Sequence, residues 1–454
     1  MSSTAAALPA AALWTRFGAF LAPLVLTNVL QALSGTLNNI YLGRMLGTDA
    51  LAAAVAFFPL LMFLIALVIG LGTGSSILAG QAWGARKPEV VQRVAGTTLA
   101  GAGALGLLVM GIGLLAIEPV LRGLRTPPEV LPQAVAYARV LLLALPALFL
   151  SLLSAALLRG VGDSITPLRM LVITTAASML LTPALIRGWL GLPQLGVASA
   201  AWAVLAGNVA SLGWLAWHLS RRHHVLAWPG VSRHLGFDAA LLGQVVRLGL
   251  PTALFFITGS LADIALLSLV NAHGLHATAA WGAVNQVMAY VQFPAISISI
   301  AASVFAAQAI GGGRQAQLPQ VTRIGLGMNL ALTGGLALLV ALLARRAAGL
   351  FVDDPAVVDL ATQALRIAVA GSVLFGMASV LSGVMRAAGT LRVPTLISLG
   401  CLALLMFPLG WTFGRTFGLP WIWLAYPATY GVGLLLQAAY FFGAWTRRPV
   451  RALV

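Results

Sequence analysis

Charged residues are scarce in this sequence. Asp, Glu, Lys and Arg make up 8% of its 454 residues, and only ten residues are acidic. Soluble domains contain about 25% charged residues, so this composition excludes an ordinary soluble protein. Cysteine is almost absent: the single Cys401 lies in an apolar run, which excludes an internal disulfide and predicts an inert buried thiol.

Hydrophobic residues, by contrast, make up 60% of the chain, and the mean hydropathy is +0.98. These values predict an all-α integral membrane protein. The apolar runs are long and continuous, which favours helices over a β-barrel, and the first run continues into a full span rather than a cleavable signal peptide. We expect about twelve transmembrane helices, at about 17–43, 51–80, 93–117, 131–158, 165–187, 195–219, 244–271, 279–310, 321–344, 357–386, 392–414 and 421–445.

The sequence repeats itself with an offset of 227 residues, which is half its length. Six spans return the chain to its starting side, so both halves have the same orientation, with a pseudo-twofold axis along the membrane normal and a cavity between the lobes. We predict an N-terminal six-helix lobe (1–220), a cytoplasmic linker (221–240) and a C-terminal six-helix lobe (241–454). Duplicated apolar chains are typical of secondary transporters. The paired landmarks include Gln81 and Gln308, Gly84 and Gly311, Pro128 and Pro355, Arg139 and Arg366, Arg159 and Arg386, and Pro167 and Pro394.

The net charge is +16, and arginine supplies nearly all of the basic residues. A basic protein can bind nucleic acid, but arginines at the ends of spans also anchor helices and set topology, which we favour here. A cytoplasmic N-terminus puts most basic residues on the cytoplasmic side, so we expect both termini there and no nucleic-acid partner. That cytoplasmic set is Arg16, Arg86, Lys87, Arg93, Arg159, Arg169, Arg221, Arg222, Arg233, Arg247, Arg314, Arg323, Arg386, Arg392, Arg447, Arg448 and Arg451.

Two sets of residues imitate ligand sites. The linker histidines His223, His224 and His234 could bind a metal, but no cysteine or carboxylate completes a known spacing. The segment Gly70-Leu71-Gly72-Thr73-Gly74 resembles a phosphate loop, but it lies inside a predicted span, where small residues allow close helix packing. We expect no bound metal and no cofactor.

The acidic residues Asp353, Asp354 and Asp359 also resemble a metal cluster. Their counterpart in the first half is Thr126-Pro127-Pro128, so the acids are not part of the repeated plan. A helix start explains both copies, since Asp or Thr favours the N-cap and Pro the first turn. No nucleophile motif of the G-x-S-x-G kind is present, and we expect no enzyme activity.

Polar side chains inside spans are costly unless they have a partner or face water, so they are functional candidates. Those of the first span occupy an arc of about 120°, and those of the eighth share one face. Each stripe could make hydrogen bonds between helices, but two whole stripes favour a cavity lining. Tyr290 and Phe293 could contact substrate, although lipid or core packing explains them equally well. The candidate cavity residues are Asn28, Gln31, Asn38, Asn285, Gln292, Tyr290 and Phe293.

Asp263 is the only acidic residue well inside a predicted span. It follows Arg247 by about 24 Å of helix. An Asp there costs roughly 2.5–3.5 kcal/mol on insertion scales, and removal from water favours the protonated carboxyl. Asp263 is therefore the candidate cation-coupling residue, and the alternative is a hydrogen-bonded Asp with a structural role.

With these residues in hand, the chain resembles the multidrug and toxic compound extrusion (MATE) family over nearly its whole length. Each motif is weak alone, but their order, spacing and duplication are specific. The motifs are Pro23, Gly43-Arg44-Met45-Leu46-Gly47, Ala50-Leu51-Ala52-Ala53, Gln81-Ala82-Trp83-Gly84-Ala85, Arg159-Gly160-Val161-Gly162-Asp163, Thr166-Pro167, Gly196-Val197-Ala198, Gly249-Leu250-Pro251, Ala279-Ala280, Gln308-Ala309-Ile310-Gly311, Arg386-Ala387-Ala388-Gly389 and Pro394.

The resemblance implies a twelve-helix efflux antiporter that expels amphipathic, often cationic compounds in exchange for inward H⁺ or Na⁺. Many bacterial members have an intramembrane Asp in the first span where this chain has Asn38. In the fifth span many have an Asn and then an Asp where this chain has Ser178 and Thr182. The first-lobe carboxylate site is therefore missing. Some members use acids in the second lobe, where Asp263 lies.

We therefore predict a monomeric antiporter of a bacterial-type inner membrane, surrounded by lipid, that exports a small organic substrate by alternating access. H⁺ is favoured over Na⁺ because one acid can carry a proton, whereas Na⁺ needs several oxygen ligands. The alternatives are a lipid-linked glycan flippase, which needs a strongly cationic cavity, a membrane-embedded lipid transferase, which needs clustered acids or histidines, and a passive facilitator.

Overall fold

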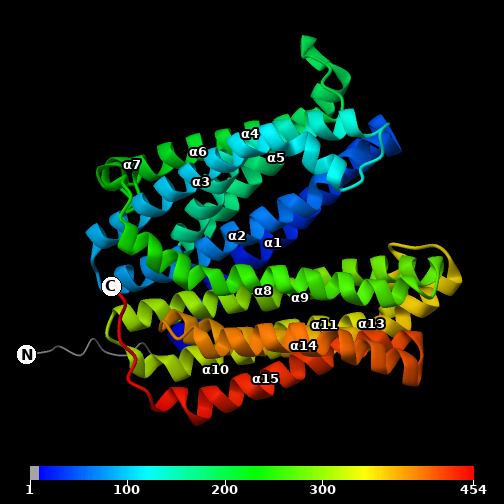
Figure 1. Cartoon of the computed structure of the whole chain (residues 1–454). Helices are drawn as coiled ribbons and strands as arrows, with labels where there is room; N and C mark the ends of the chain where they lie inside the picture. The colour runs from blue at the N-terminus through cyan, green and yellow to red at the C-terminus, as the bar shows by residue number, and fades with distance from the viewer. Residues whose placement is uncertain (1–9) are drawn as a thin grey trace, which may run out of the picture. The chain divides into compact units, whose positions relative to one another are not determined.

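The computed structural model describes residues 10–454, which form helices joined by short connections (Figure 1). Within this part of the chain, twelve helical segments are long and apolar enough to cross a membrane, which confirms the predicted fold class. The first half contains α1 (Ala10–Leu46), α2 (Thr48–Gly84), α3 (Pro88–Gly123), α4 (Leu131–Gly160), α5 (Ile165–Arg187) and α6 (Ala198–Arg221), followed by the short α7 (Trp228–Val231). The second half contains α8 (Ala239–Asn271), α9 (Leu275–Gly311), α10 (Leu318–Met328), α11 (Gly334–Leu342), α12 (Ala344–Gly349), α13 (Pro355–Ala387), α14 (Arg392–Phe417) and α15 (Ala425–Gly443).

The helices form two compact units whose boundaries fall inside α1 and α8. Unit 2 contains residues 26–253, and unit 1 contains the chain up to residue 25 together with residues 254–454. Both crossings come just after a proline within a helix, Pro23 in α1 and Pro251 in α8. Proline lacks the N–H that a helix interior uses, so each crossing follows a weakened point in the backbone ladder. The two lobes expected from the sequence repeat, residues 1–220 and 241–454, stay a prediction.

Unit 2 is held together by α2, α3, α4 and α6, whose apolar side chains share one core. The first half of α8 packs against α2 through glycine. A Cβ at Gly70 would lie 2.7 Å from the carbonyl oxygen of Gly249, and one at Gly74 would lie 2.1 Å from that of Val245. The glycine-rich segment therefore serves close helix packing, as the sequence predicted.

Unit 1 has α9 and α13 at its centre, and both are largely buried. The start of α1 packs on α9, where Phe17 and Phe20 contact the ring of Phe305 at centroid distances of 5.2 Å and 5.6 Å. Between α10 and α11 the chain makes one π-helical turn, Asn329–Thr333. Asn329 is fully buried there and donates from Nδ2 to the carbonyl oxygen of Val373 at 3.0 Å. A polar side chain anchored to α13 thus accompanies the break in the α-helical pattern.

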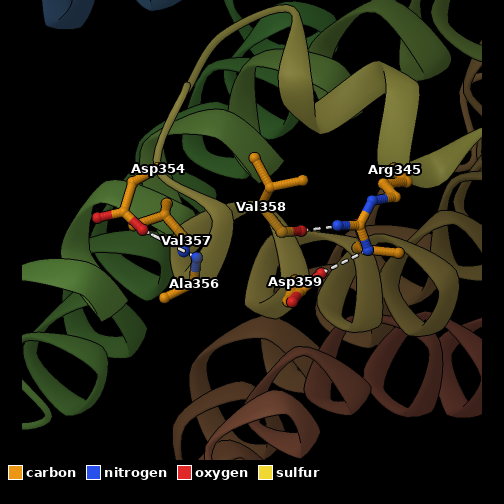
Figure 2. A network of polar contacts seen from close by, with 7 residues as sticks. Arg345, Asp354, Ala356, Val357, Val358 and Asp359 are labelled. Atoms are coloured by element: carbon orange, nitrogen blue, oxygen red, sulfur yellow. Dashed lines mark hydrogen bonds and ion pairs between the residues drawn. The ribbon is translucent and has the colours of Figure 1, made fainter.

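One of the acidic residues, Asp354, caps α13, as predicted (Figure 2). Its Oδ1 accepts hydrogen bonds from the backbone N–H groups of Ala356 at 2.8 Å and Val357 at 3.4 Å. Asp359, inside α13, accepts a hydrogen bond from Arg345 at 2.7 Å. In the first half, however, α4 begins only at Leu131 and has no side-chain cap, so the helix start predicted at Thr126-Pro127-Pro128 is wrong.

The segment between α6 and α8 is tied to α3. Arg93 of α3 forms an ion pair with Asp238, and Gln92 donates to the carbonyl oxygen of Val225 at 3.2 Å. Within the segment, Nδ1 of His224 accepts a hydrogen bond from the backbone N–H of Leu226 at 3.2 Å. This bond requires Nδ1 to carry no proton.

Replacing Gly74 with alanine should destabilise unit 2. The new methyl group meets a backbone carbonyl, and overpacking of this kind costs about 1–3 kcal/mol. Gly111→Ala is the matched control, because a Cβ at Gly111 meets nothing within 4 Å. Heating both purified variants in detergent and measuring the surviving monodisperse fraction checks this prediction. Equal midpoints for the two variants would contradict it.

The local stability of the linker should fall in mild acid. Burial lowers the pKa of His224. Asp163 raises this pKa by a smaller amount, and His218 lowers it slightly further. An unfolded linker therefore binds the proton more readily, with the ordinary His pKa of about 6.5, so the stabilisation is present above that pH and is lost as the pH falls. Hydrogen exchange of residues 222–228 at pH 7.5 and 5.5, corrected for the intrinsic rate, measures the effect. His224→Asn keeps an acceptor without a titrating ring and should remove the pH dependence.

Candidate functional site

The intramembrane carboxyl of Asp263 lies on α8 and has a partner on α15. Its Oδ1 accepts a hydrogen bond from the hydroxyl of Tyr426 at 2.7 Å. Asp263 follows the start of α8 by 24 residues and precedes its end by eight, so it lies about 12 Å of helix inward from that end. The carboxyl has an exposed side as well as the phenol contact. Tyr426 therefore supplies a hydrogen-bond donor to one oxygen of this carboxyl.

A cluster of aromatic rings holds Tyr426 in place. Tyr426 is 6% exposed, and its ring centroid lies 6.4 Å from those of Trp281 and Tyr430. Trp281 in turn contacts Trp423, which is fully buried, at 5.7 Å. Rings packed on several sides leave Tyr426 little rotational freedom. Its hydroxyl is thus positioned toward Asp263 before any ligand arrives.

The same cluster continues to the neighbouring helices of unit 1. Tyr430 contacts Phe375 of α13 at 5.4 Å, and Phe375 stacks on Phe255 of α8 at 5.9 Å with an angle of 18° between the rings. Helices α8, α9, α13 and α15 therefore all contribute rings. A movement of α15 or α13 would change the surroundings of Asp263.

Unit 2 contains a second polar contact, between two of the three positions where the sequence departs from the family pattern. Oδ1 of Asn38 on α1 accepts a hydrogen bond from the hydroxyl of Thr182 on α5 at 3.2 Å. Thr182 is fully buried, and Ser178, one turn earlier on α5, is 5% exposed. All three groups are neutral at any physiological pH. The pair can bind a ligand through hydrogen bonds, but it cannot carry a proton.

The other predicted cavity residues divide between the units. Asn28 is half-buried and Gln31 is exposed on the part of α1 in unit 2. Asn285 and Gln292 are half-buried on α9 in unit 1. The rings of Tyr290 and Phe293, also on α9, contact each other edge to face at 5.6 Å. Whether these residues line a substrate cavity stays a prediction.

Tyr426 is the residue that sequence reasoning missed. It lies in a predicted span, where a tyrosine is as easily explained by core packing. The signal in the sequence that could have pointed to Tyr426 is Tyr430, a second polar aromatic residue one turn further along the same helix. Residues 10–454 contain no group of three or more His, Cys, Asp or Glu side chains able to hold a metal ion.

Comparisons with known proteins agree with this architecture. The MatE family profile matches residues 23–184 and 251–412, one segment in each half. The chain is 38% identical, over 97% of its length and 96% of the relative's, to the probable multidrug resistance protein YoeA of Bacillus subtilis. It is 25% identical to an FAD transporter of Shewanella oneidensis, over 94% of each chain.

The fold also matches a solved structure. The crystal structure of the Vibrio cholerae MATE transporter VcmN in the bent form superposes with a TM-score of 0.87 at 19% identity, covering 96% of this chain and 98% of the other. The family profile covers well over half of the chain, and the relative from B. subtilis aligns almost end to end. This multi-pass membrane protein therefore belongs to the MatE family of transporters, and it is not an enzyme.

Proposed function

We propose that this protein exports amphipathic organic cations in exchange for protons. Family membership and a 38% identical relative named as a multidrug resistance protein support export of drug-like molecules. The observation that supports proton coupling is the contact between Asp263 and Tyr426, a single acid held by a fixed hydroxyl donor inside a span. The protein works as a monomer in a bacterial-type inner membrane with both termini in the cytoplasm.

A proton suits this site better than Na⁺. Hard cations are bound by several oxygen ligands at once. One carboxyl and one phenol make a small oxygen set, whereas a proton needs only one carboxyl oxygen. When Asp263 is charged it attracts a cationic substrate, and when it is protonated that attraction ends. Substrate and proton therefore compete for the same group, which is the minimal requirement for exchange.

The first-lobe pair contributes to substrate binding rather than to coupling. Asn38 and Thr182 are neutral and can only form hydrogen bonds. Pro23 and Pro251 give each crossing helix a point where it can bend, which supports an exchange between inward-open and outward-open states.

Asp263→Asn should abolish exchange driven by a pH gradient. One proton exchanged for one monovalent cation moves no net charge, so a gradient of one pH unit sustains about a tenfold substrate gradient in the wild type. The variant should show none. Efflux of a fluorescent cation from vesicles, with the membrane potential clamped at zero and with or without Na⁺, measures the substrate gradient of the wild type and of the variant. Asp359→Asn is the control, because it loses only an exposed ion pair worth about 0–1 kcal/mol.

Full pH-driven efflux in Asp263→Asn would refute the coupling role of this residue. A wild type that needs Na⁺ instead of a pH gradient would refute proton coupling. If neither gradient drives any amphipathic cation, the proposed substrate class is wrong.

Thr182→Val should weaken substrate binding without affecting coupling. The variant keeps the shape of the side chain and removes one hydrogen bond, so we expect KM to rise about two- to tenfold. The substrate gradient reached at one pH unit should stay the same, because no proton-carrying group has changed. Initial rates at a series of substrate concentrations give KM, and a reduced final gradient would contradict this assignment.

A further inference from the structure

Unit 2 contains an apolar crevice that the proposed transport site does not use. Its volume is about 560 Å³, and α3, α4, α6 and the segment after α6 line it. Ser154 and Trp228 supply the only polar side chains among its lining residues; the rest are Ala, Gly, Leu and Val. We call this feature the α3–α6 crevice. Its volume falls within the range of small-molecule sites, about 300–1,000 Å³.

The crevice is long and lies at membrane depth. Its wall on α3 runs from Ala95 to Leu107, which is about 18 Å of helix. The hydrocarbon of one leaflet is about 15 Å thick, half of the bilayer core. Leu107 at one end is 56% exposed and Leu235 of the linker is 42% exposed, so the crevice opens to the surface. An elongated apolar channel of this length fits an alkyl chain better than a compact solute.

Two arginines lie close in sequence to crevice residues at the linker end. Arg222 follows the lining residue Leu219 by three residues, and Arg233 lies between the lining residues Val231 and Leu235. Both are exposed. Among the residues from 10 onward, neither has a carboxylate within 4.0 Å, because the four ion pairs there involve other basic residues.

The acidic residues near this end are already engaged. Asp238 pairs with Arg93 of α3. Asp163, which interacts with His218 and His224, accepts hydrogen bonds from the backbone N–H groups of Ile165 at 3.0 Å and Thr166 at 2.9 Å. These bonds leave the negative charge of Asp163 in place, but the basic residues outnumber the acids at this end of the crevice. The rim therefore has a net positive charge, which favours an anionic group.

Aromatic residues place the same rim at the headgroup level. Trp228, which lines the crevice, is 54% exposed. At the same level, on the opposite face of α6, Trp217 is 53% exposed and the guanidinium of Arg221 lies 4.9 Å from the centre of its ring. Tryptophan and arginine together are typical of the boundary between lipid tails and headgroups.

We propose that the α3–α6 crevice binds one acyl chain of an anionic phospholipid, whose phosphate group contacts Arg222 and Arg233. The apolar walls alone would also suit an amphipathic transport substrate. A cationic substrate, however, would place its charge beside two arginines, so the rim selects the lipid. This lipid site is independent of the proton-coupling site in unit 1.

Native mass spectrometry of the full-length protein tests the proposal. The protein is purified from nanodiscs containing equal amounts of phosphatidylglycerol and phosphatidylcholine with identical acyl chains. The wild type should retain one phosphatidylglycerol in preference to phosphatidylcholine. A variant with glutamine at positions 222 and 233 should lose this preference, since each basic residue near an anionic surface contributes a factor of about five.

Gly103→Leu tests the acyl-chain half of the site. Gly103 lines the crevice, and a Cβ there meets nothing within 4 Å, so leucine fills the channel without touching backbone. Retention of both lipids should fall severalfold. Gly111→Leu is the matched control on the same helix, also with an open Cβ direction but outside the crevice, and it should retain lipid like the wild type.

Equal retention in Gly103→Leu and Gly111→Leu would overturn the acyl-chain site. Equal retention of the two lipids by the wild type would overturn the role of the arginines. Displacement of the bound lipid by ethidium in the wild type but not in Gly103→Leu would assign the crevice to a transport substrate instead. Because these measurements need no ion gradient, their outcome does not depend on proton antiport.

Discussion

Every backbone N–H and C=O inside a membrane must find a partner within the protein, and the rest of this structure depends on that constraint. It explains why the described chain forms long helices and why breaks in them are few. Where α10 gives way to a π-helical turn, Asn329 reaches the carbonyl oxygen of Val373 on α13. Where Pro23 and Pro251 weaken α1 and α8, the helix changes from one compact unit to the other.

The same constraint made much of the fold predictable. Long apolar runs located the spans, the 227-residue repeat gave two sets of six, and the N-cap role of Asp354 followed from its position before a proline. The unit boundaries inside α1 and α8 could not be predicted, because α2, α3, α4, α5, α9 and α14 also contain an internal proline. A proline alone therefore does not show where the packing partners of a helix change. The sequence located Asp263 but not its partner, since Tyr426 is 163 residues away and a tyrosine in a span looks like core.

The two repeats share their backbone landmarks but differ in their polar side chains. The two MatE segments, 23–184 and 251–412, begin at Pro23 and Pro251, which are the prolines beside the unit boundaries. The spacing between them places Gly35 opposite Asp263, where a Cβ would meet nothing within 4 Å. Unit 2 instead has the neutral contact between Asn38 and Thr182. A duplicated scaffold thus supports two different kinds of polar site, and only one of them can titrate.

The packing of the start of α1 also constrains how the chain folds as it is made. Unit 2 ends at residue 253, so it can be completed while the second half is still being synthesised. The start of α1, in contrast, packs on Phe305 of α9, nearly 300 residues later in the sequence. Contacts between segments so far apart form late, because the intervening chain must first be ordered. The start of α1 is therefore among the last segments to find its final neighbours. Cutting the chain between its two repeats would separate each unit from the part of α1 or α8 that the other repeat supplies.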